Sequence, residues 1–579
     1  MLKLYRHLKP YTAILILILA LLGIQVATTL WLPTLMSEIV DKGIVKGDTS
    51  YILKIGVEML IVTLIGIAVM ITSTYFIAKV GTGFARDLRS KLFRRVESFS
   101  QSDIDKIGIA SLITRTTNDI TQVSSVTITI LRMMITAPIM LVGGIIMAIN
   151  KSPKLSGVLM FSIPILIIVI AVIAGKGVPL FKTIQTKLDK VNQVMREKLN
   201  GIRVIRAFNK SEFESIKFNK ANKELTDTSI RVNKIMGGLQ PAVMLILNLT
   251  TVALVWVGSL RINTGAVEIG DLMAVIQYAM QIMFSLIMMA MMFVMIPRGA
   301  ASAKRINEVL EIEPSIKDDI KVESMNSDKG SIEFKDVSFA YEGAEEAVLS
   351  NISFSVNAGE TLSIIGGTGS GKSTLVSLIP RLYDVTSGKI LLNGVDIRDV
   401  SQEELRNNIG YVPQKAILFS GTIEENIKYG KEDATEEEIR HAADISQSSE
   451  FIEKIEDGYK HEISQGGTNV SGGQKQRLSI ARALVRKPSV YVFDDSFSAL
   501  DFKTDAKLRK ALKDETKDSA VIVVTQRISS AKDSNKIIVL DEGRVVGMGT
   551  HKELAKNCPL YKEIALSQLS KEEMENEFK

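Results

Sequence analysis

A glycine-rich stretch that ends in Lys-Ser-Thr holds the residue types best suited to chemistry. It fits the pattern G-x-x-x-x-G-K-[ST], follows an apolar run at 362–365 and precedes a helical pattern, which is the context that a phosphate-binding loop requires. Glycines let backbone N–H groups converge on phosphate oxygens, Lys372 adds positive charge, and the Ser373 hydroxyl suits Mg²⁺. This phosphate loop comprises Gly366, Gly367, Thr368, Gly369, Ser370, Gly371, Lys372, Ser373 and Thr374.

The composition indicates that the chain is divided. Of its 579 residues 46% are hydrophobic, yet 23% are charged, so the two kinds of residue must be segregated into a membrane part and a soluble part. The net charge of +6 is small for this length and fits loops beside anionic lipid better than a nucleic-acid surface. Cys558 is the only cysteine, which excludes an intrachain disulfide and a thiolate metal cluster.

Six uncharged runs in the first 300 residues predict six transmembrane helices, each near or above the roughly 18 residues needed to cross a bilayer. The runs cover residues 11–37, 59–78, 133–150, 155–175, 235–260 and 272–297. The connections after the second and fourth runs are long and rich in Lys and Arg, which predicts cytoplasmic loops and cytoplasmic termini. As helical hairpins these loops would project about 35–40 Å beyond the membrane.

The tips of the two long loops are expected at residues 110–119 and 207–218. Polar turns that carry a few large apolar residues, such as Phe208, Phe213 and Phe218, suit docking against a groove in another domain. A solvated helical hairpin is the alternative interpretation.

From residue 331 onward the pattern becomes that of an α/β domain. Residues 331–341 alternate as a strand, 490–493 and 521–524 are expected to be buried strands, and a hairpin is expected around 541–543. These features predict a parallel sheet that carries the phosphate loop.

Further motifs follow one another in a characteristic order. They are Tyr341, the phosphate loop, Tyr411-Val-Pro-Gln414, Val470-Ser-Gly-Gly-Gln-Lys-Gln-Arg477, Phe493-Asp-Asp495 and Ser498-Ala-Leu-Asp501. Together they resemble the nucleotide-binding domain of ATP-binding cassette (ABC) transporters, and with six preceding spans the entire chain resembles an ABC exporter half-transporter of the multidrug type. The Ser-Gly-Gly-Gln signature distinguishes this family from other P-loop ATPases.

The resemblance implies a fold and two cofactors, ATP and Mg²⁺. The fold is an α-helical six-span transmembrane domain plus a cytosolic α/β P-loop ATPase domain. Expected boundaries are 1–308 for the transmembrane domain, 309–330 for a linker and 331–579 for the nucleotide-binding domain. By the same resemblance Tyr341 stacks on adenine, Gln414 links Mg²⁺ to the docked loops, and Asp494 holds Mg²⁺ through water, beside Ser373.

The signature has a physical logic of its own. Ser471, Gly472 and Gly473 are expected to open a helix that continues through Gln474 to Leu484, and the exposed N–H groups of a helix start bind anions. In the family this helix faces the γ-phosphate held by another subunit, with Asp501 at the same partner-facing edge. The resemblance therefore implies that the chain pairs with a second subunit.

Two departures from the family pattern lie at the chemistry. The family usually has glutamate where this chain has Asp495, and a switch histidine where it has Gln526. Shortening the carboxylate by one methylene withdraws it by about 1 Å, a misplacement that can cost about a hundredfold in rate. Glutamine can hydrogen-bond a γ-phosphate but carries no positive charge for the transition state.

The resulting hypothesis is an unequal pair of subunits. This chain's own ATP site binds nucleotide but hydrolyses it weakly, while its signature completes a competent site in a non-identical half-transporter. The assembly would be a heterodimeric translocase for multidrug efflux that moves hydrophobic or amphipathic compounds across a bacterial plasma membrane, with no nucleic-acid partner. A nucleotide-gated channel or regulatory ABC subunit, and a homodimeric lipid or peptide exporter, are the alternatives.

Three features stay open at this stage. At 464–467 the chain lacks the carboxylate of the family's Gly-Glu-x-Gly motif, which leaves the coupling of this half undecided. The sixth span is rich in methionine, which suits either an adaptable cargo surface or ordinary packing. Glu38 and Asp41 follow the first span and are expected either at an outer gate or as solvated acids.

Overall fold

A computed structural model describes residues 1–318 and 330–568 of the chain. It forms two compact units, one made of residues 1–97 and 109–312 and the other of residues 98–108 together with the chain from 313 onward. The expected boundaries at 308 and 331 differ from this division, because helix α12 continues to Glu311 and because residues 98–108 join the second unit. Residues 319–329 of the expected linker lie outside the described residues.

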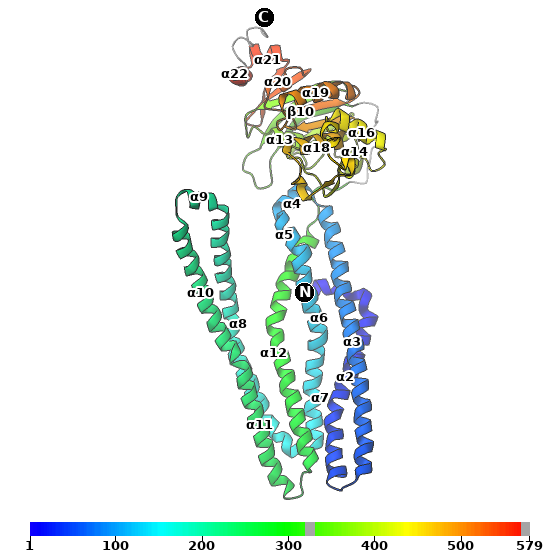
Figure 1. Ribbon diagram of the computed structural model, residues 1–579, viewed down its shortest axis with the longest axis vertical. Helices are drawn as coiled ribbons and strands as arrows, with labels where there is room; N and C mark the ends of the chain where they lie inside the picture. The colour runs from blue at the N-terminus through cyan, green and yellow to red at the C-terminus, as the bar shows by residue number, and fades with distance from the viewer. Residues whose placement is uncertain (319–329, 569–579) are drawn as a thin grey trace. The chain divides into compact units, whose positions relative to one another are not determined.

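The described part of the first unit is helical (Figure 1). In chain order its helices are α1 (Leu2–Tyr5), η1 (Arg6–Tyr11), α2 (Thr12–Glu38), η2 (Ile39–Ile44), α3 (Thr49–Glu97), α5 (Ile109–Thr114), η3 (Arg115–Asp119), α6 (Ile120–Thr129), η4 (Ile130–Met134), α7 (Ile135–Lys151), α8 (Pro153–Asn200), α9 (Ile202–Ala207), α10 (Ser211–Gly237), α11 (Leu239–Ile262) and α12 (Ile269–Glu311). The segment η1 is a 3-10 helix, whereas η2, η3 and η4 are π-helical turns.

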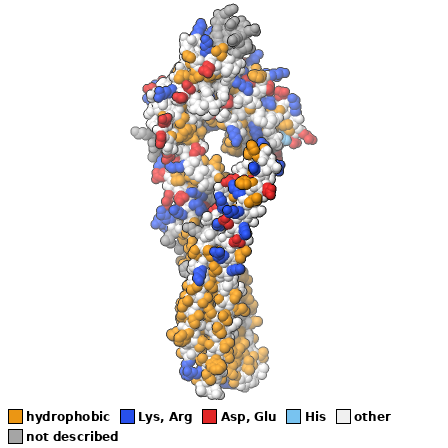
Figure 2. All heavy atoms as spheres, turned by 90° about the vertical axis from the view of Figure 1, so that its left-hand side faces the viewer, with side chains coloured by type: hydrophobic (Ala, Val, Ile, Leu, Met, Phe, Trp, Pro, Cys, Tyr) orange, Lys and Arg blue, Asp and Glu red, His pale blue; other side chains and the backbone are white. Residues whose placement is uncertain are grey.

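Six helical segments of the described chain are long and apolar enough to cross a membrane, which confirms the six predicted spans. These are Lys3–Ile44, Thr49–Glu97, Ile109–Lys151, Pro153–Gly177, Ser211–Ile262 and Ile269–Glu311. Hydrophobic side chains dominate the face that these spans present in Figure 2. The chain is therefore a multi-pass membrane protein.

The second long loop is a helical hairpin, as predicted, but its turn lies earlier in the chain. Helices α8 and α10 run side by side and α9 joins their ends (Figure 1). The turn spans Gly201 to Lys210, because α10 already begins at Ser211, so only the first residues of the predicted 207–218 tip belong to it. Phe208 in the turn and Phe213 in the first turn of α10 are 73% and 63% exposed.

The predicted tip of the first long loop is wrong. Residues 110–119 lie within α5 and η3, which already run back toward the third span. The tip is instead α4 (Gln101–Ile107), which opens with a capping box between Ser100 and Asp103 and ends at Gly108, whose φ of +83° only glycine adopts readily. The capping box starts α4 and Gly108 ends it, so the tip of the loop lies earlier in the chain than the polar run at 110–119 predicts.

The second unit is built on two main sheets. The strands are β1 (Ile332–Phe339), β2 (Leu349–Val356), β3 (Thr361–Gly366), β4 (Ser387–Leu392), β5 (Val395–Asp396), β6 (Ile409–Val412), β7 (Gly421–Thr422), β8 (Glu462–Ile463), β9 (Val490–Asp494), β10 (Ala520–Val524), β11 (Lys536–Asp541) and β12 (Arg544–Gly549). A four-stranded antiparallel sheet has the order β2-β1-β4-β5, a six-stranded sheet has the order β12-β11-β3-β10-β9-β6, and β7 pairs with β8.

Five strands of the larger sheet, from β11 to the edge strand β6, pair in parallel, as predicted, and β12 joins β11 in the expected hairpin. A hydrophobic core fills the space between the two sheets, with Phe334 and Phe354 stacked at 4.4 Å between ring centroids. Because parallel strands end at one edge, this core fixes where the segments after β3, β9 and β10 emerge.

The helices of this unit cover the sheets and carry the loops. Besides α4 they are α13 (Lys372–Ser377), α14 (Gln402–Asn407), α15 (Ile423–Lys428), α16 (Glu436–Ile445), α17 (Ser449–Ile452), the 3-10 turns η5 (Gly458–Lys460) and η6 (Gln465–Gly467), α18 (Gly472–Leu484), α19 (Phe502–Glu515), α20 (Ile528–Ala531), α21 (His551–Asn557) and α22 (Pro559–Gln568). Capping boxes open α15, α16, α18 and α21, which explains where these helices begin.

Candidate ATP site

The phosphate loop lies between β3 and α13 at the carboxyl edge of the parallel sheet. Gly369 and Gly371 have φ angles of +85° and +95°, which side chains other than glycine rarely adopt. A Cβ on Gly366 would lie 2.1 Å from the carbonyl oxygen of Leu540, so this position requires glycine for close packing. The predicted loop therefore has the backbone freedom that a phosphate cradle needs.

Lys372 is buried and points back across the loop. Its Nζ donates hydrogen bonds to the carbonyl oxygens of Gly366 at 2.9 Å and Gly367 at 2.6 Å. Burial lowers the pKa of Lys372, and the nearby Asp495 and Asp494 carboxylates partly offset this effect. The ammonium group is thus held where the phosphates of a nucleotide would need positive charge.

Ser373 and Asp494 meet beside the loop. The Ser373 hydroxyl donates to Asp494 Oδ1 at 3.0 Å, and Asp494 is the last residue of β9. Burial raises the pKa of the Asp494 carboxyl, and the hydrogen bond from Ser373 opposes that rise. A hydroxyl and a carboxylate that converge at the phosphate loop are oxygen donors of the kind Mg²⁺ prefers, so the residues fit this ion.

Asp495 follows Asp494 in a strained backbone conformation, with φ of +45°. Its Oδ2 accepts a hydrogen bond from Gln414 Nε2 at 3.5 Å, and burial raises the pKa of its carboxyl. Gln414 comes two residues after β6, the neighbour of β9 in the sheet. The structure therefore brings together the four residues Ser373, Gln414, Asp494 and Asp495 that the sequence proposed for the metal and the water.

The switch loop, defined here as residues 525–528, leaves the end of β10. The Gln526 side chain is exposed, whereas its backbone is held: Gln568 Nε2 donates to the Gln526 carbonyl oxygen at 2.7 Å, and the Ile528 amide donates to Gln568 Oε1 at 2.9 Å. Arg527 donates to the carbonyl oxygen of Ser498 at 2.9 Å, which joins this loop to the segment before Asp501. No sequence pattern pointed to Gln568, because its partners lie 40 and 42 residues away.

The signature residues open helix α18 as predicted. Ser471 is the N-cap: its Oγ accepts from the Gln474 amide at 3.3 Å, and Gln474 Oε1 accepts from the Ser471 amide at 2.8 Å. Gly472 is exposed, and a Cβ there would meet nothing within 4 Å. Asp501 caps α19 through the amides of Lys503 and Thr504 at 3.1 and 3.0 Å. Both helix starts are formed within this chain alone.

Tyr341 lies just beyond β1 and is 39% exposed. Its hydroxyl is 3.0 Å from Thr374 Oγ1, so the ring lies beside the phosphate loop. Tyr383 meets this ring edge-on, with 5.4 Å between centroids and planes at 90°. An exposed aromatic face beside a phosphate loop is suited to stacking on a nucleotide base.

The structure shows the local surroundings of the segment at 464–467 and of the two acids after the first span. In the segment that lacks the carboxylate, Gly466 turns with φ of +67° and its carbonyl oxygen accepts from Lys475 Nζ at 2.9 Å. Asp41 is buried rather than solvated, because its Oδ1 accepts from the Gly270 amide at 2.6 Å. Glu38 pairs with Lys42 at 3.4 Å in a more exposed setting.

The methionines of the sixth span do not form one surface. Met273, Met280 and Met291 are exposed in the chain, whereas Met283 and Met292 are buried. The exposed ones follow helical spacing with Phe284, which is 58% exposed, and so share one side of α12. The buried methionines therefore fit the packing interpretation, and the exposed side of the helix is where the cargo-surface interpretation remains to be tested.

Comparison with known proteins decides the family. The model of the ABC transporter transmembrane region matches residues 14–287, and the ABC transporter model matches residues 349–498. An uncharacterized ABC transporter ATP-binding protein of Mycobacterium tuberculosis (strain CDC 1551 / Oshkosh) is 41% identical over 97% of both chains. This chain belongs to the ABC transporter family.

Other relatives agree with this assignment along the whole length. The uncharacterized ABC transporter ATP-binding protein YfiB of Bacillus subtilis (strain 168) is 40% identical over 99% of this chain and 100% of its own, and an ATP-dependent lipid A-core flippase of Desulfotalea psychrophila (strain LSv54 / DSM 12343) is 33% identical over 96% of each. A solved bacterial Atm1-family ABC exporter with ATP bound matches with a TM-score of 0.78 and 25% identity, covering 97% of this chain and 99% of that one. The ABC chain described here is thus an exporter with a transmembrane region and an ATP-binding domain.

Proposed function

We propose that this chain is the nucleotide-holding subunit of a heterodimeric, ATP-driven exporter. Its cargo would be hydrophobic or amphipathic compounds, drugs among them, moved outward across a bacterial plasma membrane with the ATP-binding domain in the cytoplasm. The observation that carries the proposal is the contrast within one domain: an open, well-capped signature helix at Ser471, and aspartate and glutamine at the two positions where the family pattern has glutamate and a switch histidine.

Weak hydrolysis is expected from the reach and the charge of two side chains. Asp495 carries a carboxylate one methylene shorter than glutamate, and that carboxylate already bonds Gln414. Gln526 can donate one hydrogen bond to phosphate but supplies no charge. Nucleotide binding is not affected by either change, because Lys372, Ser373 and the glycines of the phosphate loop are all in place. Bound Mg²⁺ would neutralise phosphate charge, held beside Ser373 and Asp494.

The intact signature helix leads us to expect a partner subunit that is not identical to this chain. The Gly472 and Gly473 amides at the start of α18 suit a phosphate that this chain does not itself hold. A homodimer would combine that signature with two weak sites, whereas a heterodimer combines it with a site that keeps glutamate and histidine. In such a heterodimer, nucleotide binding at both sites would close the two ATP-binding domains and open the pathway outward. Hydrolysis at the partner's site would then return the dimer to its starting state.

The deciding experiment compares the chain alone with the chain purified together with the subunit that accompanies it in its native membrane. We expect slow ATP turnover by the chain alone, fast turnover by the pair, and an unchanged pair rate after Asp495→Asn. Substitution of the partner's residue at the matching position should abolish turnover. Fast turnover by the solo chain that is lost on Asp495→Asn would refute the proposal and support the homodimeric alternative.

A second measurement separates pump from gate. In sealed vesicles the pair should accumulate an amphipathic dye against its gradient when Mg-ATP is added to the cytoplasmic face. Passive ion conductance that opens with ATP, without uphill dye movement, would favour a nucleotide-gated channel instead. The named flippase among the relatives makes a lipid probe the natural second cargo to test.

A further inference from the structure

The short helix α4 docks on the same unit that carries the ATP site, and it docks beside Tyr341. Tyr383 donates a hydrogen bond from its hydroxyl to Asp105 Oδ2 at 2.7 Å, and Lys106 Nζ pairs with Glu342, the neighbour of Tyr341, at 2.7 Å. Asp105 and Lys106 are consecutive in α4, so one turn of this helix contacts both the ring partner of Tyr341 and its neighbour in the chain.

Three aromatic rings connect this contact to the nucleotide-base position. Phe339, Tyr341 and Tyr383 lie within 4.9 to 5.6 Å of one another between centroids, and Tyr341 meets the other two nearly edge-on. Edge-to-face pairs depend on orientation, so a rotation of one ring changes its contact with the next. A base stacked on Tyr341 would therefore change the ring contact between Tyr341 and Tyr383, although the base itself does not touch Tyr383.

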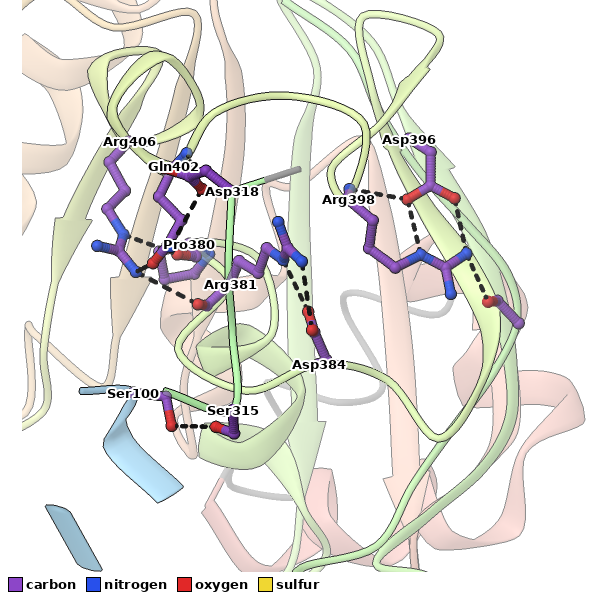
Figure 3. Close-up of polar contacts among 11 residues, drawn as sticks. Ser100, Ser315, Asp318, Pro380, Arg381, Asp384, Asp396, Arg398, Gln402 and Arg406 are labelled. Carbon is purple, nitrogen blue, oxygen red and sulfur yellow. Dashed lines mark hydrogen bonds and ion pairs between the residues drawn. The ribbon is translucent and has the colours of Figure 1, made fainter. Parts of the chain in front are cut away.

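The loop that carries Tyr383 is rigid at its ends. Arg381 is buried with φ of +52°, and its Nε donates to Asp384 Oδ1 at 2.7 Å, so the two residues that flank Leu382 and Tyr383 are joined to each other. Figure 3 shows this pair of side chains pointing toward one another near the contact between Ser100 and Ser315. The Tyr383 hydroxyl is thus a fixed donor, and burial together with Asp105 raises the pKa of Tyr383, which keeps it protonated.

The other end of α4 is also anchored to this unit. Asp103, which is buried, caps α4 at Ser100 and accepts a hydrogen bond from the Ser315 amide at 3.1 Å, and the hydroxyls of Ser100 and Ser315 are 2.6 Å apart. A cavity of about 210 Å³ remains between α4 and the end of β1, lined by Ser100, Ser102, Tyr341 and Tyr383 among others. The cavity borders both rings, so the space between α4 and Tyr341 is not filled by side chains.

We propose that Tyr383 is a positioning residue that transmits base occupancy at this chain's own ATP site to α4. The proposal rests on the proposed function, since a weakly hydrolysing site would then serve to report that ATP is bound. Chain continuity carries the signal onward, because α4 lies between α3 and α5, which continue into the second and third spans. The coupling is reciprocal, so docking of α4 also strengthens binding of the base.

Hydrogen exchange on the full-length pair tests this directly. Mg-ATP and Mg-tripolyphosphate both present three phosphates, but only ATP presents a base. We expect both ligands to protect the amides of the phosphate loop, and only ATP to slow exchange over residues 100–108, by about fivefold or more. In Tyr383→Phe the phosphate loop should stay protected by ATP while the response of α4 disappears.

Two further variants sharpen the test. Asp105→Ala should reproduce the effect of Tyr383→Phe, and the double variant should add nothing, because both remove one interaction. Tyr459→Phe is the matched control: its hydroxyl lies 3.4 Å from Ser449 Oγ, on the α17 side of the unit, and its α4 response should equal that of the unaltered chain.

The outcomes separate the inference from the function on which it rests. An α4 response that survives Tyr383→Phe, or one that tripolyphosphate produces as well as ATP, would overturn the role of Tyr383 and leave the exporter proposal standing. Absence of ATP protection over the phosphate loop itself would overturn both, because the site would then hold no nucleotide.

Discussion

The signature helix and the carboxyl edge of the central sheet belong to one unit of this protein, but they differ in how closely their residues match the family pattern. At the signature helix, the residues expected for phosphate recognition are present, capped and open to a partner at Ser471 and Gly472. At the sheet edge, the phosphate and metal positions are equally well formed, and Asp495 and Gln526 stand where the family pattern has glutamate and histidine. The proposed function therefore separates nucleotide binding from bond cleavage, because different side chains would serve the two.

The largest effect is expected at the signature helix. Gly472→Asp places a carboxylate where the partner's bound phosphate is expected, and the open space around Gly472 means that folding should be unaffected. Turnover of the pair should fall about a hundredfold or more, the scale of losing one anion-binding donor. Thr435→Asp, which adds the same charge at the exposed N-cap of α16, is the control and should leave the ATPase rate unchanged. Equal activity of the two variants would mean that α18 faces no phosphate.

The next effect concerns the sheet edge. Asp495→Glu combined with Gln526→His restores the reach of the base and a chargeable switch residue, so single-turnover hydrolysis at this chain's own site should rise about tenfold or more. The measurement uses the pair with the partner's site inactivated, so that only one site reports. If the single-turnover rate stays the same while ATP still binds, the side chains at these two positions do not limit hydrolysis at this chain's own site.

A smaller effect is expected where Gln568 forms hydrogen bonds with the backbone of the switch loop. Gln568→Ala removes both hydrogen bonds that hold the backbone at Gln526 and Ile528. One of these bonds is part-buried and the other exposed, and the loss of two hydrogen bonds of about 1 kcal/mol each should speed hydrogen exchange at Ile528 by about fivefold or more. Ser567→Ala, one residue earlier, loses only a bond within α22 and serves as the control. Unchanged exchange at Ile528 would show that the loop is held by its own turn.

The smallest effect is on stability and depends on pH. Burial raises the pKa of Asp494 in the folded state, so its neutral form favours folding below about pH 4 and that contribution is lost as pH rises through the raised value. Asp494→Asn keeps the neutral form at every pH. It should raise the melting temperature at pH 7 by about 2–4 °C and leave it unchanged near pH 4. Asp433→Asn, which alters an exposed acid, is the control and should leave the melting temperature unchanged at both pH values.

Much of the architecture could be predicted from local patterns. The six spans, the phosphate loop, the strands β1, β3, β9 and β10, and the start of α18 all depend on residues within about twenty positions of one another. The first loop tip differs from the prediction, because the polar run at 110–119 resembles a turn in sequence, whereas the capping box at Ser100 starts the tip helix earlier in the chain. The second tip likewise lies a few residues earlier than predicted, because α10 already begins at Ser211.

Sequence by itself therefore determined that this protein has six spans, an ATP-binding domain and a phosphate loop, because hydrophobic length and glycine spacing act over short stretches of chain. Tertiary structure decided which distant side chains meet. Tyr383 and Asp105 are 278 residues apart, and Gln568 reaches Gln526 from the last described helix. Such contacts depend on how sheets and helices pack, since a hydrogen bond requires partners within about 3 Å and no local pattern encodes that proximity.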